Sequence, residues 1–317
     1  MRFQDELVEL RMLWGNYWSS RVLLTANNLG VFEHLKSPRT SEDIASTLKT
    51  DLRATEILLD ALSGLGLLKK ASNKYRNSTK ANRFLISSSP YYQGNIIKHG
   101  DAIWKNWSAL DDVVKTGKPA HMSFDNDAFI RGMHDISKIK AKSVIKLINL
   151  KGVMRALDLG GGPGTYSIEL ARKGISVTLF DLPDTIRISR EIIKESEIKS
   201  IDFTEGDFLL DDIGNNYDLI FISQVLHAFS EDDNLRIIEK SAGALNAGGK
   251  IVVQEFSIGN DRVYPTKSAL FSVNMLVNTK GGRCYSTSEI KRWLYKAGMR
   301  EIQEKVFEDC IILIAGF

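Results

Sequence analysis

Acidic side chains and glycines recur at defined points in the second half of this 317-residue chain. Asp158 opens a glycine-rich stretch that includes Gly160 and Gly162, and Asp181 and Asp207 each end a later run of apolar and β-branched residues. Glycines between a strand and a helix let the backbone turn sharply and approach a ligand closely. A carboxylate at the end of the next strand can accept hydrogen bonds from ribose hydroxyls. The pattern predicts a nucleotide-binding site.

The details of the loop exclude two common nucleotides. A dinucleotide fingerprint needs glycine at position 165, where Thr165 stands, and the Gly-Lys-Ser/Thr of a phosphate-binding loop is absent. Asp158 would be poorly placed beside a pyrophosphate, but it suits a ligand with ammonium and sulfonium charges. Asp207, followed by Phe208, is placed to bond an adenine amine with the phenyl ring against the base. NAD and ATP are therefore disfavoured.

One of the five histidines, at positions 34, 99, 121, 134 and 227, stands at a chemically useful point. His227 follows the apolar run Tyr217–Ser223, which reads as a strand. This places the imidazole at the mouth of a sheet, beside the glycine loop. Histidine is the side chain whose ordinary pKa, near 6.5, suits proton transfer at neutral pH.

The elements that must position these residues alternate between strands and helices from residue 155 onward. The expected strands are Arg155–Leu159, Val177–Asp181, Asp202–Asp207, Tyr217–Ser223, Lys250–Phe256, Arg300–Phe307 and Cys310–Ala315. Helical stretches such as Tyr166–Lys173 and Ile186–Glu195 lie between several of them. Alternation of this kind predicts a doubly wound, mostly parallel α/β sheet. The last two runs are joined too tightly for a parallel crossover and should form an antiparallel hairpin at the sheet edge.

The first half of the chain reads as mostly helical. Residues 3–24 carry an apolar stripe rich in aromatic side chains, and Thr40 and Asp43 form a capping-box pattern at a helix start. A second helix should stop at Gly64–Gly66, and the polar stretch Lys69–Arg76 suits a β-hairpin. Helix, turn, helix and hairpin outline a winged helix.

Composition places the chain among ordinary globular proteins. It is 43% hydrophobic with a net charge of +3, which argues neither for nucleic acid nor for an anionic membrane. The two cysteines, Cys284 and Cys310, form neither a metal-ligand pair nor a disulfide framework, which favours a reducing, cytoplasmic compartment. The first residues do not read as a signal peptide, no apolar run reaches the roughly 20 residues of a membrane span, and no Asp/Asn/His cluster predicts a metal.

Together these motifs resemble the class I S-adenosylmethionine (SAM)-dependent small-molecule O-methyltransferases with an N-terminal winged-helix dimerisation domain. The group includes caffeate, acetylserotonin and polyketide methyltransferases. The resemblance covers essentially the whole chain and rests also on Leu29–Leu35, Trp107, Gly117–Pro119, Phe129–Met133, Phe180–Pro183, Val225–His227 and Gly248–Val253. It implies a seven-stranded Rossmann-like sheet, SAM as cofactor, a small-molecule acceptor and a homodimer. It divides the chain into a dimerisation domain (1–90), a helical connector that contributes to the substrate pocket (91–150) and a SAM-binding catalytic domain (151–317).

The resemblance also implies roles for single residues. His227 would be the general base, supported by Glu255. The cofactor would be bound by Asp158, Gly160, Gly162, Asp181, Leu182, Asp207 and Phe208, with Ser137 at its methionine end and Ser223 and Gln224 lining the crevice. Phe129, Met133 and Met275 would face the methyl acceptor.

Two positions depart from the family pattern. A second acid that commonly supports the histidine is Cys284 here, and the aspartate that commonly follows the histidine is Ala228. The base would be less strongly supported, so a carbon, nitrogen or sulfur acceptor stays an alternative to a hydroxyl. The sequence does not identify the acceptor.

A winged helix also allows a different class of function, a DNA-binding regulator that senses SAM. Residues 1–90 hold 13 Lys/Arg against 9 Asp/Glu, and the hairpin region is basic. The segment that would read bases, Thr55–Leu65, is apolar and has no Arg, Asn or Gln, which favours an interface between subunits instead. A SAM-fold protein without transfer activity is a third alternative, against which His227 argues.

Overall fold

The computed structural model describes residues 3–120 and 123–317, so His121 lies outside the described residues. The chain forms two compact units that divide between Ala102 and Ile103. No helix within the described residues is long and apolar enough to cross a membrane.

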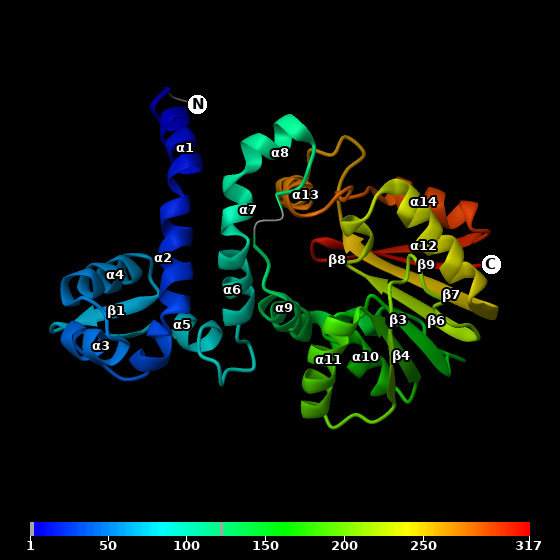
Figure 1. The fold of residues 1–317 in the computed structure, drawn as a ribbon, viewed down its shortest axis with the longest axis horizontal. Coiled ribbons are helices and arrows are strands. Elements are labelled where there is room, and N and C mark those ends of the chain that lie inside the picture. Colours follow the sequence, from blue (N-terminus) through cyan, green and yellow to red (C-terminus); the bar gives the residue numbers. More distant parts are fainter. Residues whose placement is uncertain (1–2, 121–122) are drawn as a thin grey trace. The chain divides into compact units, whose positions relative to one another are not determined.

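The N-terminal unit contains the predicted winged-helix outline (Figure 1). Its elements are α1 (Phe3–Gly15), α2 (Tyr17–Asn28), η1 (Val31–Leu35), α3 (Ser41–Leu48), α4 (Leu52–Gly64), β1 (Leu68–Ala71), β2 (Lys74–Asn77), α5 (Thr79–Phe84) and α6 (Gly94–Ala102). The capping box at Thr40 and Asp43 is formed at the start of α3, and α4 ends at Gly64 as expected. Strands β1 and β2 pair antiparallel, which confirms the hairpin.

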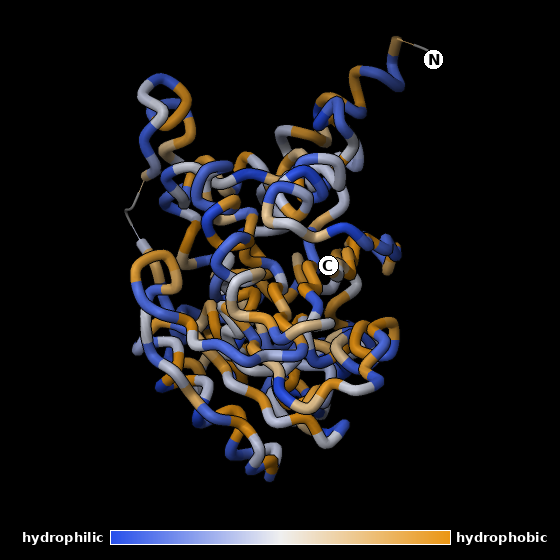
Figure 2. Tube along the Cα trace, turned by 90° about the vertical axis from the view of Figure 1, so that its right-hand side faces the viewer, coloured by the Kyte–Doolittle hydropathy of each residue, from blue (hydrophilic) through white to orange (hydrophobic). Residues whose placement is uncertain are grey.

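The apolar stripe of residues 3–24 is divided between two helices. Helix α1 buries none of its side chains, whereas α2 buries Leu24 and Ala26. Apolar and polar segments alternate along α1, next to the N label in Figure 2. The unit's core lies elsewhere, around Phe32, Leu59 and Tyr75.

The C-terminal unit is built on the predicted seven-stranded sheet, in the order β5-β4-β3-β6-β7-β9-β8. Its strands are β3 (Arg155–Leu159), β4 (Ser176–Asp181), β5 (Ile201–Glu205), β6 (Tyr217–Ser223), β7 (Leu245–Phe256), β8 (Glu301–Phe307) and β9 (Cys310–Gly316). Neighbouring strands from β5 to β7 pair in parallel. Strands β9 and β8 are antiparallel, so the expected hairpin at the sheet edge is confirmed.

Two strand boundaries differ from the sequence prediction by more than one residue. Strand β5 ends at Glu205, so Asp207 lies in the turn beyond it rather than at its last position. Strand β7 begins at Leu245 instead of Lys250, because Leu245 already pairs with Tyr217 before an irregularity in the register.

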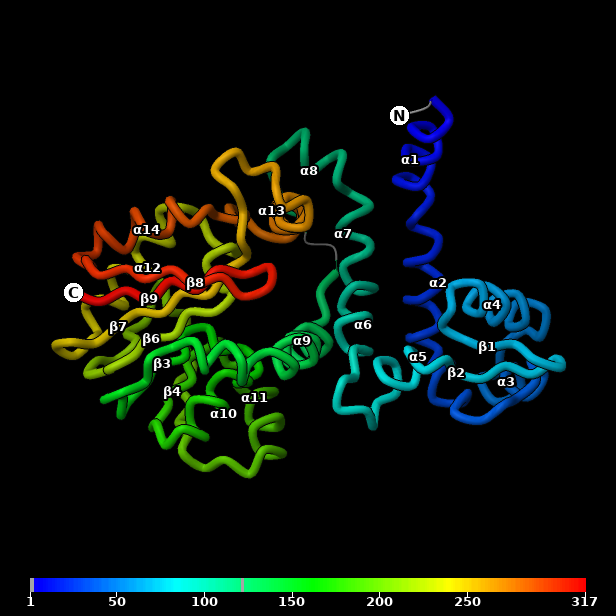
Figure 3. Tube along the Cα trace, turned by 180° about the vertical axis from the view of Figure 1, so that it is seen from behind, coloured from blue at the N-terminus to red at the C-terminus, as the bar shows by residue number. Residues whose placement is uncertain are grey.

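Helices cover both faces of this sheet, as Figures 1 and 3 show. The helices of this unit are α7 (Trp104–Ser108), α8 (Leu110–Thr116), α9 (Asn126–Lys146), α10 (Thr165–Ala171), α11 (Pro183–Glu195), η2 (Leu226–Ala228), α12 (Glu231–Gly243), α13 (Thr266–Asn278) and α14 (Thr287–Lys296). Buried side chains of α9, α10 and α11 pack on one face, and those of α12 and α14 pack on the other. The carboxyl ends of β3, β4, β6 and β7 therefore meet at one edge, where a doubly wound sheet binds its ligand.

Candidate active site

The glycine loop after β3 takes conformations that only glycine adopts easily. Gly160 and Gly162 have φ of +66° and +53°. A Cβ at Gly160 would lie 2.8 Å from Val225 Cγ2, whereas a Cβ at Gly162 would meet no atom within 4 Å. Gly160 therefore permits close contact with the turn after β6, and Gly162 faces open space that a ligand can enter.

Asp158, the acid that opens the loop, is buried beneath it. Only 1% of the residue is exposed, and its Oδ2 accepts a 2.6 Å hydrogen bond from the Ser167 hydroxyl. Burial raises the pKa of Asp158 to about 6, and the nearby charge of Asp181 acts in the same direction. A positive charge close to the loop would therefore stabilise the ionised form of Asp158.

Asp181 lies at the end of β4 and faces the loop. Its Oδ2 accepts the Gly162 N–H at 2.8 Å, and its Oδ1 accepts the Leu182 N–H at 2.7 Å. Burial raises the pKa of this carboxyl, while these two backbone hydrogen bonds act the other way. Each carboxylate oxygen has a second lone pair, so Asp181 can still accept two ribose hydroxyls. The Leu182 side chain is half exposed beside it.

Asp207 and Phe208 follow β5. The carboxylate of Asp207 accepts the Leu209 N–H at 2.9 Å, and this bond holds the turn. The Phe208 ring packs edge-on against Phe229, with centroids 5.3 Å apart, and its Cε1 lies 3.4 Å from where a Cβ at Gly160 would stand. Phe208 thus lies next to the glycine loop, and the contact of its ring with an adenine stays a prediction.

These residues fit the cationic ligand that the sequence predicted. Within the described ranges, Asp158, Asp181 and Asp207 form no ion pair with Lys, Arg or His. Asp158, an acid beneath the glycine loop without a cation to neutralise it, suits the ammonium and sulfonium of SAM and would repel a pyrophosphate.

His227 and Glu255 are in direct contact at the same edge of the sheet. His227 Nδ1 lies 2.8 Å from Glu255 Oε2, and the backbone N–H of His227 donates to Glu255 Oε1 at 3.3 Å. Glu255 comes from the end of β7 and is 3% exposed, whereas 12% of the His227 side chain remains exposed. The carboxylate therefore holds the proton on Nδ1 and leaves Nε2 free to accept another proton.

Two aromatic rings beside His227 were not predicted. Phe271 of α13 meets the imidazole at 5.0 Å and 88°, and Phe256 lies 5.7 Å away. The two phenyl centroids are themselves 4.4 Å apart. Phe271 could have been found from the sequence, because it lies one helical turn before Met275, and Phe256 directly follows Glu255.

Cys284 lies close enough to Glu255 for the two groups to interact electrostatically. Burial raises the pKa of the Cys284 thiol to about 11, a hydrogen bond with Ser272 lowers it, and Glu255 raises it further. The thiol is therefore neutral at physiological pH and cannot act as the second acid. Just before it, a Cβ at Gly282 would lie 2.3 Å from the His227 carbonyl oxygen, so this glycine permits the contact between the two segments.

The predicted crevice residues occupy two different elements. The Ser223 hydroxyl donates to Gln254 Oε1 at 3.1 Å, and Gln224 Nε2 donates to Cys310 Sγ at 3.5 Å. Ser137 lies half-buried on α9. One turn earlier on α9, His134 Nδ1 lies 2.9 Å from the Thr165 hydroxyl, and this contact of α9 with the end of the glycine loop was not predicted.

The predicted acceptor residues also come from separate helices. Met275 is buried on α13, the helix that carries Phe271. Phe129 and Met133 lie half-buried on α9, where the Phe129 ring packs 5.6 Å from Phe124. Whether these three residues contact an acceptor stays a prediction.

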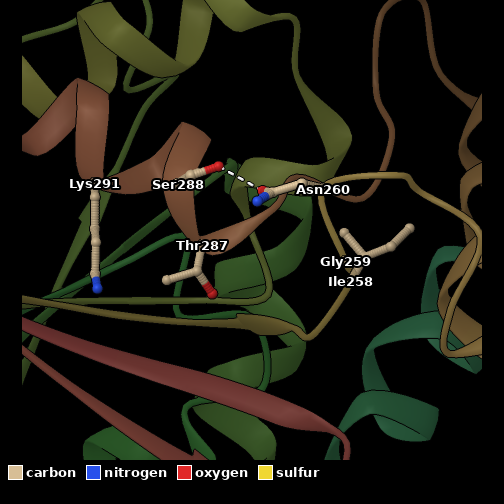
Figure 4. A pocket seen from close by; sticks show the side chains of 6 residues that line it. All are labelled: Ile258, Gly259, Asn260, Thr287, Ser288 and Lys291. Atoms are coloured by element: carbon tan, nitrogen blue, oxygen red, sulfur yellow. Dashed lines mark hydrogen bonds between the residues drawn. The ribbon is translucent and has the colours of Figure 1, made fainter.

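A pocket of about 310 Å³ on this unit is lined by none of the predicted site residues (Figure 4). It is lined by Ile258, Gly259, Asn260, Thr287, Ser288 and Lys291. The Ser288 hydroxyl bonds Asn260 Oδ1 at 2.6 Å across it. In the part of the chain that the structure describes, no group of three or more His, Cys, Asp or Glu could hold a metal ion.

Comparison with known proteins agrees with this geometry. Residues 110–300 match an O-methyltransferase domain, and residues 12–87 match an O-methyltransferase dimerisation domain. The chain is 31% identical to 3-hydroxy-5-methyl-1-naphthoate 3-O-methyltransferase of Streptomyces sahachiroi, over 90% of this chain and 87% of the relative. It is 30% identical to acetylserotonin O-methyltransferase of Gallus gallus, over 90% of this chain and 89% of the relative.

The crystal structure of human N-acetylserotonin methyltransferase in complex with SAM superposes with a TM-score of 0.88 at 26% identity, covering 100% of this chain and 98% of the other. The chain therefore belongs to the O-methyltransferase family and is a SAM-dependent O-methyltransferase.

Proposed function

We propose that this enzyme methylates a hydroxyl group of a small aromatic or polyketide-like molecule, with His227 as the general base. The observation that carries the proposal is the 2.8 Å contact between His227 Nδ1 and Glu255 Oε2, beside the glycine loop. Val225 supports this placement, because it belongs to the same turn as His227 and packs against Gly160.

The arrangement assigns a task to each side chain. Glu255 orients the imidazole, so that Nε2 accepts the hydroxyl proton while the carboxylate stabilises the imidazolium that forms. A phenol with a pKa near 10 and a histidine near 6.5 differ by roughly 3.5 units, or about 5 kcal/mol. Removal of the proton must therefore be concerted with attack on the methyl group, and general-base catalysis of this kind contributes about 10²–10⁴-fold.

The cofactor would be held by the residues around the loop. Asp181 would accept the ribose hydroxyls, Phe208 would cover the adenine, and Ser137 would contact the methionine end. When bound, SAM supplies an electrophilic methyl group on a sulfonium. Asp158 would favour its positive charges, and Asp207 would bond the adenine amine.

The surroundings of His227 favour an apolar, flat acceptor. Phe256, Phe271 and the neutral Cys284 thiol surround His227 and its partner Glu255, and Met275 lies on the same helix as Phe271. Named relatives include a hydroxynaphthoate methyltransferase and TcmO, a tetracenomycin polyketide 8-O-methyltransferase of Streptomyces glaucescens. These names support an aromatic hydroxyl as the acceptor of this enzyme too.

A screen with labelled SAM tests both the acceptor and the base. Phenols, quinols, polyketides and thiols are offered, and NMR identifies the methylated atom. We expect transfer to a hydroxyl oxygen, and we expect His227→Ala to lower kcat by about 10²–10⁴-fold. Calorimetry should show SAM binding to this variant nearly unchanged. Undiminished turnover of a hydroxyl acceptor by His227→Ala would refute the assignment of the base.

We also propose that the enzyme is a homodimer that associates through its N-terminal unit. The match to a dimerisation domain covers residues 12–87, and α1 exposes most of its apolar side chains. On this reading residues 1–90 form the dimerisation domain, residues 91–150 the connector and residues 151–317 the catalytic domain.

A further inference from the structure

The turn that carries His227 begins at a residue with an unusual backbone. Gln224 has φ of +58°, in the left-handed region that residues with a Cβ rarely adopt. It stands between the end of β6 at Ser223 and the short helix η2. A backbone of this kind persists only where its surroundings impose it, and such residues gather at functional sites.

Contacts on both sides hold Gln224 in this conformation. Its N–H donates to the carbonyl oxygen of Gln254 at 2.9 Å, which extends the β6–β7 pairing by one residue. Its side-chain Nε2 reaches Cys310 Sγ at 3.5 Å. The side-chain Oε1 is buried and has no hydrogen-bond partner among the described residues. A buried oxygen without a partner destabilises a fold, so stability alone does not account for glutamine at this position.

The direction of the chain after Gln224 decides what its next residues touch. Val225 packs against Gly160 of the glycine loop, and His227 reaches Glu255 with both its N–H and Nδ1. A residue with negative φ at 224 would send this turn along another path. It would then separate Val225 from the loop or His227 from Glu255.

From this geometry we infer that Gln224 is a positioning residue, whose left-handed backbone orients the turn that places His227 against Glu255. The inference concerns the backbone of Gln224, and the side chain keeps its predicted place in the cofactor crevice. The inference rests on the proposed role of His227 and adds to it the reason why the imidazole takes its position.

Two substitutions separate the backbone from the side chain. Gln224→Gly permits positive φ without cost, whereas Gln224→Val, a β-branched residue, disfavours it strongly. Both variants lose a side chain that lines the predicted cofactor crevice, so they are compared with each other at saturating SAM. We expect kcat of Gln224→Val to lie at least about tenfold below that of Gln224→Gly. A side chain that acted by contact would give the opposite order, because glycine removes more of it than valine does.

A matched control lies at the other end of the same strand. Asn216 has φ of +64° immediately before β6, and it is exposed. Asn216→Val imposes the same backbone conflict far along the strand, so it should lower the melting temperature without changing kcat measured well below that temperature. An equal loss of kcat in Asn216→Val and Gln224→Val would mean that the effect is general destabilisation.

Imidazole NMR of ligand-free protein with ¹⁵N-labelled histidine measures the placement without turnover. The Nδ1–H resonance of His227, identified by its absence in His227→Ala, should be alike in the wild type and Gln224→Gly and should shift in Gln224→Val. The inference fails if this resonance is unchanged in Gln224→Val, or if Gln224→Gly loses as much activity as Gln224→Val. Full activity of His227→Ala would instead reject His227 as the base. The NMR result on the position of the His227 imidazole would still hold.

Discussion

At the scale of single residues, the chemistry of this enzyme depends on how each acid is partnered. Glu255 contacts His227, Asp181 binds backbone N–H groups, and Asp158 lies buried on a serine hydroxyl. Similar side chains thus have three different surroundings: one contacts the proposed base, one keeps lone pairs that can accept ribose hydroxyls, and one lies buried beneath the loop. Because Cys284 is neutral, Glu255 is the acid in contact with the proposed base.

Asp181 should be needed for cofactor binding. Asp181→Ala removes the oxygens that would accept the ribose hydroxyls and also frees the Gly162 N–H. Hydrogen bonds to a charged group contribute about 1.5–3 kcal/mol each, so we expect the Kd for SAM to rise at least about tenfold. Calorimetric titration measures this, with the exposed Asp202→Ala as the control. An unchanged Kd would remove Asp181 from the cofactor site.

His134 should make stability depend on pH. Burial lowers the pKa of His134 to about 4, and Lys138 and Arg131 add to the effect. In the unfolded chain the pKa of His134 is about 6.5. Between pH 6.5 and 4, His134 is therefore protonated in the unfolded state but neutral in the folded state. The contribution to stability is present above pH 6.5 and is lost as the pH falls towards 4.

We expect His134→Gln to remove this loss, which amounts to about 2 kcal/mol over that range. Chemical denaturation of the ligand-free protein at pH 7.5, 5.5 and 4.5 measures it. The wild type should lose stability relative to His134→Gln as the solution is acidified. If the free energies of unfolding of the two proteins changed in parallel with pH, folding would not lower the pKa of His134.

At the scale of elements, two glycine contacts hold the turn from Gln224 to Ala228 between other segments. Gly160 allows Val225 to approach the loop after β3, and Gly282 allows the segment after α13 to approach His227. The glycine loop and the segment after α13 thus both contact the turn that carries His227. An added methyl group at either contact would move it.

Gly282→Ala should therefore lower catalysis more than cofactor binding. The new Cβ would lie 2.3 Å from the His227 carbonyl oxygen and 2.6 Å from Thr279 Oγ1, so one of these segments must shift. A displacement of about 1 Å at a catalytic group can reduce the rate about 10²-fold, and we expect kcat to fall at least tenfold with little change in the Kd for SAM. Gly243→Ala is the control, because a Cβ there meets no atom within 4 Å. Equal kcat in both variants would show that the Gly282 contact is not needed.

At the scale of the whole molecule, the two units differ in how much of their apolar side-chain surface is exposed. The C-terminal unit buries its aliphatic residues on both faces of the sheet. In the N-terminal unit, α1 and the start of α2 expose large apolar side chains, among them Leu13, Trp14 and Trp18. Exposed apolar surface on this scale is typical of a face that another protein chain covers.

We expect this face to hold the dimer together. Trp14 and Trp18 are each 61% exposed, and a charge at either position would be buried without a partner in an interface. The double variant Trp14→Glu/Trp18→Glu should sediment as a monomer at micromolar concentration, and the wild type as a dimer. Met154→Glu, at an exposed position of the C-terminal unit, should remain dimeric. A double variant that stays dimeric would place the interface on another surface.

The sequence alone determined most of the catalytic unit, because its signals are local. Strand and helix periodicity, the glycine loop and the short link between β8 and β9 predicted the sheet and its antiparallel edge. The order of the strands then brought Asp158, Asp181 and His227 to one edge, since parallel strands end on the same side. Tertiary structure alone decided the rest. The backbone of Gln224 and the closeness of Gly282 to the His227 carbonyl oxygen depend on packing between segments distant in sequence. No spacing within one segment encodes such contacts.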